Sequence, residues 1–162
     1  MVSIASFADR IVSLIAEVQR QYYRLLIVAG PVGSGKTRAL QLVSDRTGAP
    51  ILNVNLEVAR ALLPMTERQR SVRLPRVMEQ IVTSATTAGN LVLLDNTEIL
   101  FDTALKQDPL RLLQRLSRNR TIVSTWGGRV EGREIVHADP DHPEYRRYPI
   151  GDFEVVELQA GQ

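Results

Sequence analysis

Residues 30–37 read GPVGSGKT, and their types and spacing suit the binding of a nucleotide phosphate. Glycines let successive backbone N–H groups turn toward an anion, where a Cβ would clash or forbid the required φ. Lys36 is expected to reach the β- and γ-phosphates, and the Thr37 hydroxyl is expected to ligate Mg²⁺. The motif therefore predicts an ATP-binding loop of eight residues: Gly30, Pro31, Val32, Gly33, Ser34, Gly35, Lys36 and Thr37.

A second anchor for Mg²⁺ is expected at the end of a buried strand beside the strand that precedes this loop. Asp95 follows the apolar run LVLL and fits that place, so Asp95 and Thr37 are the predicted Mg²⁺ ligands. The next residue is Asn96, where many hydrolysing P-loop ATPases of the additional-strand class carry a glutamate. Glu98 is the best substitute for that general base, and Glu57 is another. Either glutamate is otherwise a solvated surface acid.

The remaining candidate catalytic groups are a hydroxyl and several arginines. Thr125, which follows Ser124 at the end of an apolar run, could sense the γ-phosphate. An arginine supplied by a neighbouring subunit commonly stabilises the transition state in this class of enzyme. The candidates for that arginine are Arg118, Arg120, Arg146 and Arg147. The last two are favoured because they lie just before the last predicted strand.

Strand-like and helix-like segments alternate along the chain, and these elements must position the candidate residues. Short apolar runs that end in Gly or Asp are typical of parallel strands buried on both faces. Five strands are predicted, at residues 25–29, 51–56, 91–94, 121–125 and 153–158, with a weaker edge strand at 134–138. Helices are predicted at residues 37–46, 58–88 and 108–119, with a short helical turn at 142–148.

Prolines, glycines and a capping aspartate set the expected ends of these helices and strands. Asp108 and Pro109 give a helix start, because proline is favoured at the first helical position. Pro64 and Pro75 should break the long helical pattern of residues 58–88. The glycines at 127 and 128 should end the fourth strand.

The first 24 residues are predicted to form one helix that packs on the core of the same chain. Apolar residues fall at helical spacing from Phe7 to Val18, and Ser6 with Asp9 gives a capping-box start. A helix that binds a partner or a membrane is the alternative.

The alternation of strands and helices predicts an α/β fold, namely a three-layer P-loop NTPase core with a mainly parallel, about five-stranded sheet and an N-terminal helix. Residues 1–162 are expected to form a single domain, in which residues 127–162 supply the C-terminal edge and the last strand.

Composition narrows the function classes. The chain has no cysteine, which excludes disulfides, thiolate metal sites and cysteine nucleophiles. Without a long apolar run or a signal peptide, a cytoplasmic protein that does not bind membranes is expected. The formal net charge of +2 permits contact with DNA but does not argue for it. Four arginines at residues 68–76 are flanked by glutamates, so a solvated helix face is favoured there.

Several stretches resemble the BrxF family, the small P-loop protein of type III bacteriophage-exclusion (BREX) systems. They are ILNVNLEVARALL, LVLLDNTEILFD, LKQDPLRLLQRLSRNRTIVSTWGG and HPEYRRY. The resemblance covers residues 25–148 and implies a multi-gene antiviral system that modifies host DNA, with its other proteins as partners. By the same likeness, residues 30–37 would hold the triphosphate and Asp95 the metal. The domain also resembles the core of AAA-type ATPases without their helical lid.

Three functions follow as hypotheses. The first is an Mg²⁺-dependent ATPase that converts ATP to ADP and phosphate within an antiviral defence complex, as an oligomer or with partners. The second is a small-molecule kinase, because GPVGSGKT also fits shikimate-kinase-like enzymes. The third is a non-hydrolysing, ATP-switched adaptor, which Asn96 suggests. The ATPase is ranked highest, the adaptor next and the kinase last.

Overall fold

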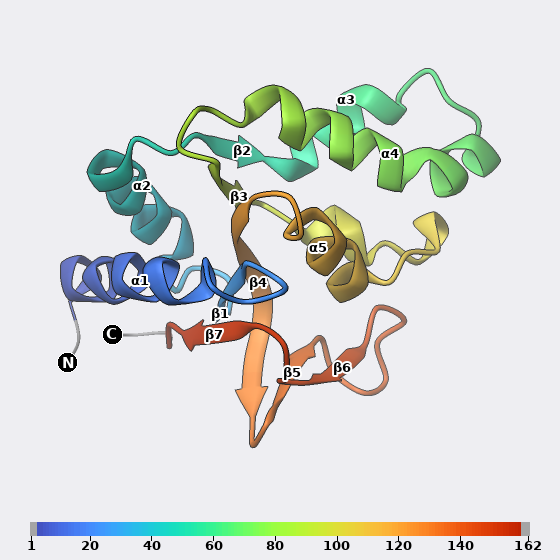
Figure 1. Cartoon of the computed structure of the whole chain (residues 1–162). Coiled ribbons are helices and arrows are strands. Elements are labelled where there is room, and N and C mark those ends of the chain that lie inside the picture. Colours follow the sequence, from blue (N-terminus) through green and yellow to red (C-terminus); the bar gives the residue numbers. More distant parts are fainter. Residues whose placement is uncertain (1–2, 160–162) are drawn as a thin grey trace.

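A computed structural model of the chain describes residues 3–159. Five parallel strands form the centre of the sheet in the order β2-β3-β4-β1-β7 (Figure 1). Their bounds are β1 Leu25–Gly30, β2 Ile51–Asn53, β3 Leu91–Asp95, β4 Thr121–Glu131 and β7 Glu154–Glu157. The predicted α/β fold with a mainly parallel sheet is confirmed.

Helices cover both faces of this sheet and complete three layers (Figure 1). One face carries α1 (Ile4–Val18) and α2 (Lys36–Thr47), and Leu26 and Val28 of β1 pack there. The other face carries α3 (Val54–Leu62), α4 (Glu67–Ala85) and α5 (Pro109–Leu116), with the 3-10 helices η1 (Glu98–Phe101) and η2 (Thr103–Leu105). Because β1 is buried on both faces, the end of this strand is a rigid place from which to start the phosphate-binding loop.

The N-terminal helix packs on the core as predicted, but it begins earlier than the sequence suggested. Ser3 is the N-cap and its Oγ accepts a hydrogen bond from the Ser6 backbone N–H at 3.0 Å, so the expected start at Ser6 was wrong. Phe7, Ile11 and Val18 are buried in the core shared with α2. Residues 1–2 of the predicted N-terminal segment and residues 160–162 of the predicted C-terminal region lie outside the described residues.

The prediction for residues 51–88 was wrong at two places. The second strand ends at Asn53, because the Asn53 side chain caps α3 by accepting a hydrogen bond from Leu56 N at 3.1 Å. Pro64 does separate two helices, but Pro75 lies inside α4. Proline has no N–H to give to the carbonyl four residues earlier. The Gln107 side chain donates to that carbonyl, the Ser71 oxygen, at 2.8 Å, which satisfies the freed acceptor.

The chain after residue 125 also departs from the prediction. β4 continues through both glycines to Glu131. A Cβ on Gly128 would clash with the Val136 carbonyl of the neighbouring strand, so the close approach of the two strands requires glycine there. This extension pairs antiparallel with β5 (Glu134–His137), which confirms a strand at that place. The helical turn predicted at 142–148 overlaps the strand β6 (Arg146–Pro149), so its last three residues are extended and not helical. β6 pairs antiparallel with β5. Within residues 3–159, no helix combines the length and apolar composition that crossing a bilayer requires.

A buried arginine ties the helical layer to the start of β4. The Arg120 guanidinium is 6% exposed and donates to both carboxylate oxygens of Glu79, at 2.8 and 3.1 Å. It also donates to Thr83 Oγ1 at 3.1 Å and to the Leu116 carbonyl at 3.0 Å. The hydrogen bonds from Arg120 to Glu79 are the largest cause of a pKa of the Glu79 carboxyl that is lower than its usual value. Arg120 therefore acts inside its own chain and cannot reach a neighbouring subunit.

We expect Glu79→Gln to lower the free energy of unfolding at neutral pH by about 1 kcal/mol, since one charged hydrogen-bond partner of a buried cation is lost near solvent. A carboxyl whose pKa is lower in the native state stabilises the fold at pH values above its unfolded pKa of about 4.3. This contribution is lost as the pH falls through the native pKa. The difference from wild type should therefore shrink below about pH 4.3. Urea titrations across pH measure it, with the exposed Glu17→Gln as control. A pH-independent difference would contradict this account.

Candidate functional site

The phosphate-binding loop runs from the end of β1 to the start of α2. Gly35, directly before Lys36, has φ of +103°, a conformation that side chains other than glycine rarely adopt. At Gly30 a Cβ would lie 2.5 Å from the Leu158 carbonyl oxygen and 2.6 Å from Ser34 Oγ. Glycine is therefore required at both ends of the loop, as the motif predicted. The helix that follows directs its first backbone N–H groups at the loop.

Lys36 lies across the mouth of the loop. Its Nζ donates to the Gly30 carbonyl at 2.5 Å and to the Pro31 carbonyl at 2.8 Å. Burial lowers the pKa of this ammonium group, and the nearby charges of Glu98 and Asp95 act in the opposite direction. Both carboxylates line the same cavity as the ammonium group. A bound phosphate would replace the two carbonyls as its partner.

A cavity of about 440 Å³ opens on this loop. It joins residues from two distant segments, the loop and α2 on one side and the end of β3 on the other. The four residues there with a predicted catalytic or metal-binding role are Lys36, Thr37, Asp95 and Glu98. Val32, Gly33 and Gly35 also line it, together with Arg38, Gln41 and Asn96.

Asp95 ends β3, but β3 is not beside β1. The sheet order places β4 between them, so the expectation of adjacent strands was wrong. The Asp95 carboxylate is 5% exposed and accepts a hydrogen bond from the Asn96 N–H at 2.9 Å. Two strand spacings of about 4.8 Å each separate β3 from β1, yet Asp95 lines the same cavity as Lys36 and Thr37.

Thr125 lies level with Asp95 on the intervening strand. The β3–β4 register pairs Leu94 with Ser124, so the next residues of the two strands stand side by side. Side chains alternate along a strand, and Leu93 and Val123 pack in the core under α1 and α2. Asp95 and Thr125 therefore face the α2 side, whereas Ser124 faces the opposite layer. Thr125, the predicted sensor of the γ-phosphate, thus lies on the same face of the sheet as Asp95.

Glu98 is held at the edge of the cavity by a single asparagine. Its Oε2 accepts a hydrogen bond from Asn55 Nδ2 at 3.0 Å, and Asn55 Oδ1 accepts from Ile99 N at 2.8 Å. The Asn55 N–H donates to the Asn96 carbonyl at 2.8 Å, which fixes the turn after β3. Glu57 instead lines a different cavity and pairs with Arg60. The structure thus brings Glu98, and not Glu57, to the phosphate loop.

A second cavity of about 390 Å³ adjoins the first and shares Val32 and Glu98 with it. Its far wall is the extension of β4 and β5, where His137 lies. The His137 ring stacks on Phe101 at 3.7 Å, and its Nδ1 donates to the Gly127 carbonyl at 2.6 Å. Sequence reasoning missed His137, because nothing local indicates that β4 would continue and carry this residue back to the loop.

The candidate arginines are not gathered at the cavity of their own chain. Arg146 donates to the Gln107 carbonyl at 2.7 Å. Arg147 forms ion pairs with Glu131 of β4 and Glu134 of β5. The Arg118 guanidinium lies over the Tyr22 ring, 5.0 Å from its centroid. An arginine role for Arg118, Arg146 or Arg147 would therefore have to be exerted on a neighbouring subunit.

The residues at the loop fit an Mg²⁺–nucleotide. Ser34 Oγ is buried and has no hydrogen-bond partner in residues 3–159, so the loop retains an unused polar group. No cluster of three or more His, Asp or Glu side chains in the described part of the chain could hold a metal alone. Mg²⁺ usually takes one or two protein ligands and completes its shell with phosphate oxygens and water. Thr37 and Asp95 could supply those two ligands.

No family model and no curated protein matches this chain. Among solved structures, PCH-2 from C. elegans is similar over 94% of this chain, with 18% identity and a TM-score of 0.48. The ORC from Drosophila, solved bound to DNA, is similar over 93% of this chain, with 17% identity and a TM-score of 0.47. This chain spans only 42% and 41% of the lengths of those two proteins.

Proposed function

We propose that this chain binds ATP with Mg²⁺ at residues 30–37 and hydrolyses it to ADP and phosphate. The observation that supports this most is the single cavity lined by the positive-φ glycines of the loop and by Lys36, Thr37 and Asp95. Sizing of the protein together with phosphate release, each with and without ATP and Mg²⁺, tests the proposal. Absence of phosphate release would overturn the proposed hydrolysis, and absence of ATP binding in a nucleotide titration would overturn the whole proposal.

Each residue has a role that follows from its chemistry. The loop N–H groups and Lys36 would bind the phosphates, while Thr37 and Asp95 would hold Mg²⁺, which neutralises charge on the β- and γ-phosphate oxygens. Thr125 would hydrogen-bond the γ-phosphate or the attacking water from β4. Glu98 would accept a proton from that water as its oxygen bonds to the γ-phosphorus and ADP leaves.

Glu98→Gln is expected to lower ATP turnover by about 100-fold while ATP binding stays within a few-fold of wild type, because general-base catalysis typically contributes 10²–10⁴-fold. The amide still accepts a hydrogen bond from Asn55, so the η1 turn should keep its place. Steady-state phosphate release and nucleotide titration give the two quantities. Glu57→Gln, the matched change at the other candidate base, should leave turnover unchanged. Equal losses in both variants would remove Glu98 from this role.

A non-hydrolysing switch is the second candidate, and the turn after β3 favours it. Asn96 occupies the position where a water-orienting glutamate is common, and its φ is +51°. Glu98 is exposed and already bonded to Asn55. In this case ATP would order the loops and change affinity for a partner. Tight ATP binding with no phosphate release, even with partners present, would select this function.

A small-molecule kinase is the third candidate, and the cavity beside the loop is what favours it. About 390 Å³ lined by Glu98, Arg129 and His137 could hold a phosphate acceptor next to Val32. Transfer of phosphate from ATP to a panel of hydroxyl-bearing metabolites distinguishes this candidate. ATP turnover without any acceptor favours the ATPase.

The place of this activity in a bacteriophage-exclusion system is a proposal that rests on the sequence resemblance to the BrxF family. Partners would then be other proteins of that system, and arginines offered between subunits would make assembly and catalysis interdependent. Phage plating on bacteria that carry the complete system tests this role. Loss of protection with the Lys36→Ala gene supports it, and full protection would contradict it.

A further inference from the structure

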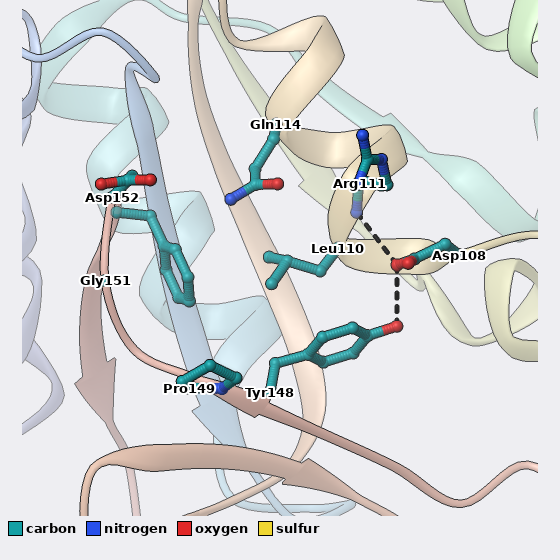
Figure 2. A pocket seen from close by; sticks show the side chains of 9 residues that line it. Asp108, Leu110, Arg111, Gln114, Tyr148, Pro149, Gly151 and Asp152 are labelled. Carbon is teal, nitrogen blue, oxygen red and sulfur yellow. Dashed lines mark hydrogen bonds between the residues drawn. The ribbon is translucent and has the colours of Figure 1, made fainter.

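Two neighbouring cavities, of about 310 and 260 Å³, form a groove beside α5. They share Arg111, Gln114 and Asp152. Figure 2 shows the α5 side chains on one side of the larger cavity and Tyr148, Pro149 and Asp152 on the other. We call the two cavities together the α5 groove. None of its residues lines the cavity at the phosphate loop.

Three arginines, Arg111, Arg115 and Arg118, line the smaller cavity of the groove. Arg111 and Arg115 lie on α5 four residues apart, the spacing that places side chains on one helix face, and Arg118 lies in the turn after the helix. All three are exposed, and within residues 3–159 no ion pair joins any of them to a carboxylate. Arg24 donates to the Arg118 carbonyl at 3.1 Å and adds a fourth cation at this end.

Two tyrosines stand at the same end of the groove. Tyr23 lines the smaller cavity and meets Tyr22 edge to face, with the ring centroids 4.8 Å apart. The Tyr22 side chain is 65% exposed, which is unusual for a large ring, and the Arg118 guanidinium covers one face at 5.0 Å. An exposed ring beside arginines can stack with a planar base.

The acidic groups at the groove do not balance these cations. Asp108 accepts hydrogen bonds from Tyr148 Oη at 2.8 Å and from Arg111 N at 3.2 Å, so it is engaged within the fold (Figure 2). Burial of the Tyr148 hydroxyl and its hydrogen bond to Asp108 raise the pKa of Tyr148. Asp152 is the remaining carboxylate that lines the groove. Three arginines therefore line the groove against one carboxylate that has no partner within residues 3–159, and Arg24 adds a further cation beside Arg118.

We propose that the α5 groove binds single-stranded nucleic acid, with backbone phosphates on Arg111, Arg115 and Arg118 and a base stacked on Tyr22. The aromatic ring favours this ligand over an acidic peptide, which has no planar base to stack. It also favours a single strand over a duplex, whose bases are already stacked on each other.

The groove is separate from the ATP site. Tyr22 and Tyr23 precede β1, whereas the phosphate loop follows it. β1 is six residues long, which at roughly 3.3 Å per residue puts about 20 Å between the two ends. ATP held by the loop cannot reach the groove, so Lys36→Ala should leave binding of the strand intact.

Fluorescence anisotropy with a labelled oligodeoxythymidine of about 20 nucleotides tests the proposal. Neutralising Arg111, Arg115 and Arg118 together to Gln should weaken binding by at least tenfold and flatten its dependence on salt between about 50 and 200 mM. Tyr22→Ala should weaken binding by about tenfold and leave the salt dependence unchanged, because stacking releases no counterions.

The matched control neutralises three exposed arginines of α4, Arg68, Arg73 and Arg76, to Gln. This removes the same charge from another helix and should alter binding less than twofold. Equal weakening by the control would mean unspecific charge attraction and would overturn the proposal. So would no binding of the oligonucleotide, equal affinity for a duplex of the same length, or displacement by polyglutamate at equal charge.

Discussion

Lys36→Ala should abolish measurable ATP turnover and weaken ATP binding by at least about tenfold. The ammonium group is the one loop cation aimed at the phosphates, and hydrogen bonds to charged groups contribute about 1.5–3 kcal/mol each. Removal of a preorganised donor to developing charge typically costs a further 10²–10³ in rate. Isothermal titration with ATP and Mg²⁺, together with phosphate release, measures both effects.

The only other lysine of the chain, Lys106, provides the control. It is exposed at the end of η2, so Lys106→Ala should leave ATP binding and turnover at wild-type levels. Lys36 also donates hydrogen bonds to the Gly30 and Pro31 carbonyls, so the thermal stability of both variants should be compared. Unchanged ATP affinity in a folded Lys36→Ala variant would refute the proposed function.

Asp95→Asn should lower ATP turnover by at least about 100-fold and remove the stimulation of ATP binding by Mg²⁺. The amide oxygen can still accept the Asn96 N–H bond, but it carries no charge for the metal. ATP affinity measured without Mg²⁺ should therefore stay close to that of wild type. Titrations of ATP with and without Mg²⁺, beside phosphate release, separate these effects.

The unfolding temperature of Asp95→Asn distinguishes a metal-binding carboxylate from one that stabilises the fold. Asp95 is 5% exposed and has no ion pair among the described residues, so its burial costs free energy that the neutral amide avoids. Asp95→Asn should then unfold at the same temperature as wild type or higher. Asp45→Asn, an exposed change on α2, is the control. A marked fall in unfolding temperature together with full turnover would show that Asp95 supports the fold and not the metal.

Local sequence predicted the elements near the loop well, because their signals are short-range. Residues 25–29 are apolar on both faces, and Gly30 to Thr37 combine glycines with a helix start, so strand, loop and helix were all found at their places. Asp108 and Pro109 likewise gave the start of α5 correctly. Errors arose where a long-range contact overrides a local preference, as Gln107 does for Pro75 and as β5 does for Gly128.

The sequence by itself determined the chemistry that this protein can offer, namely a glycine loop, one ammonium group, one hydroxyl and an acid at a strand end. These depend on residue type and on backbone preferences over a few residues. Only the tertiary structure decided that β4 lies between β1 and β3, that Glu98 and His137 line one cavity at the loop, and that Tyr22 lies beside Arg118, just after α5. Strand order and strand length depend on packing between segments that are far apart in the chain, and no local pattern encodes that packing.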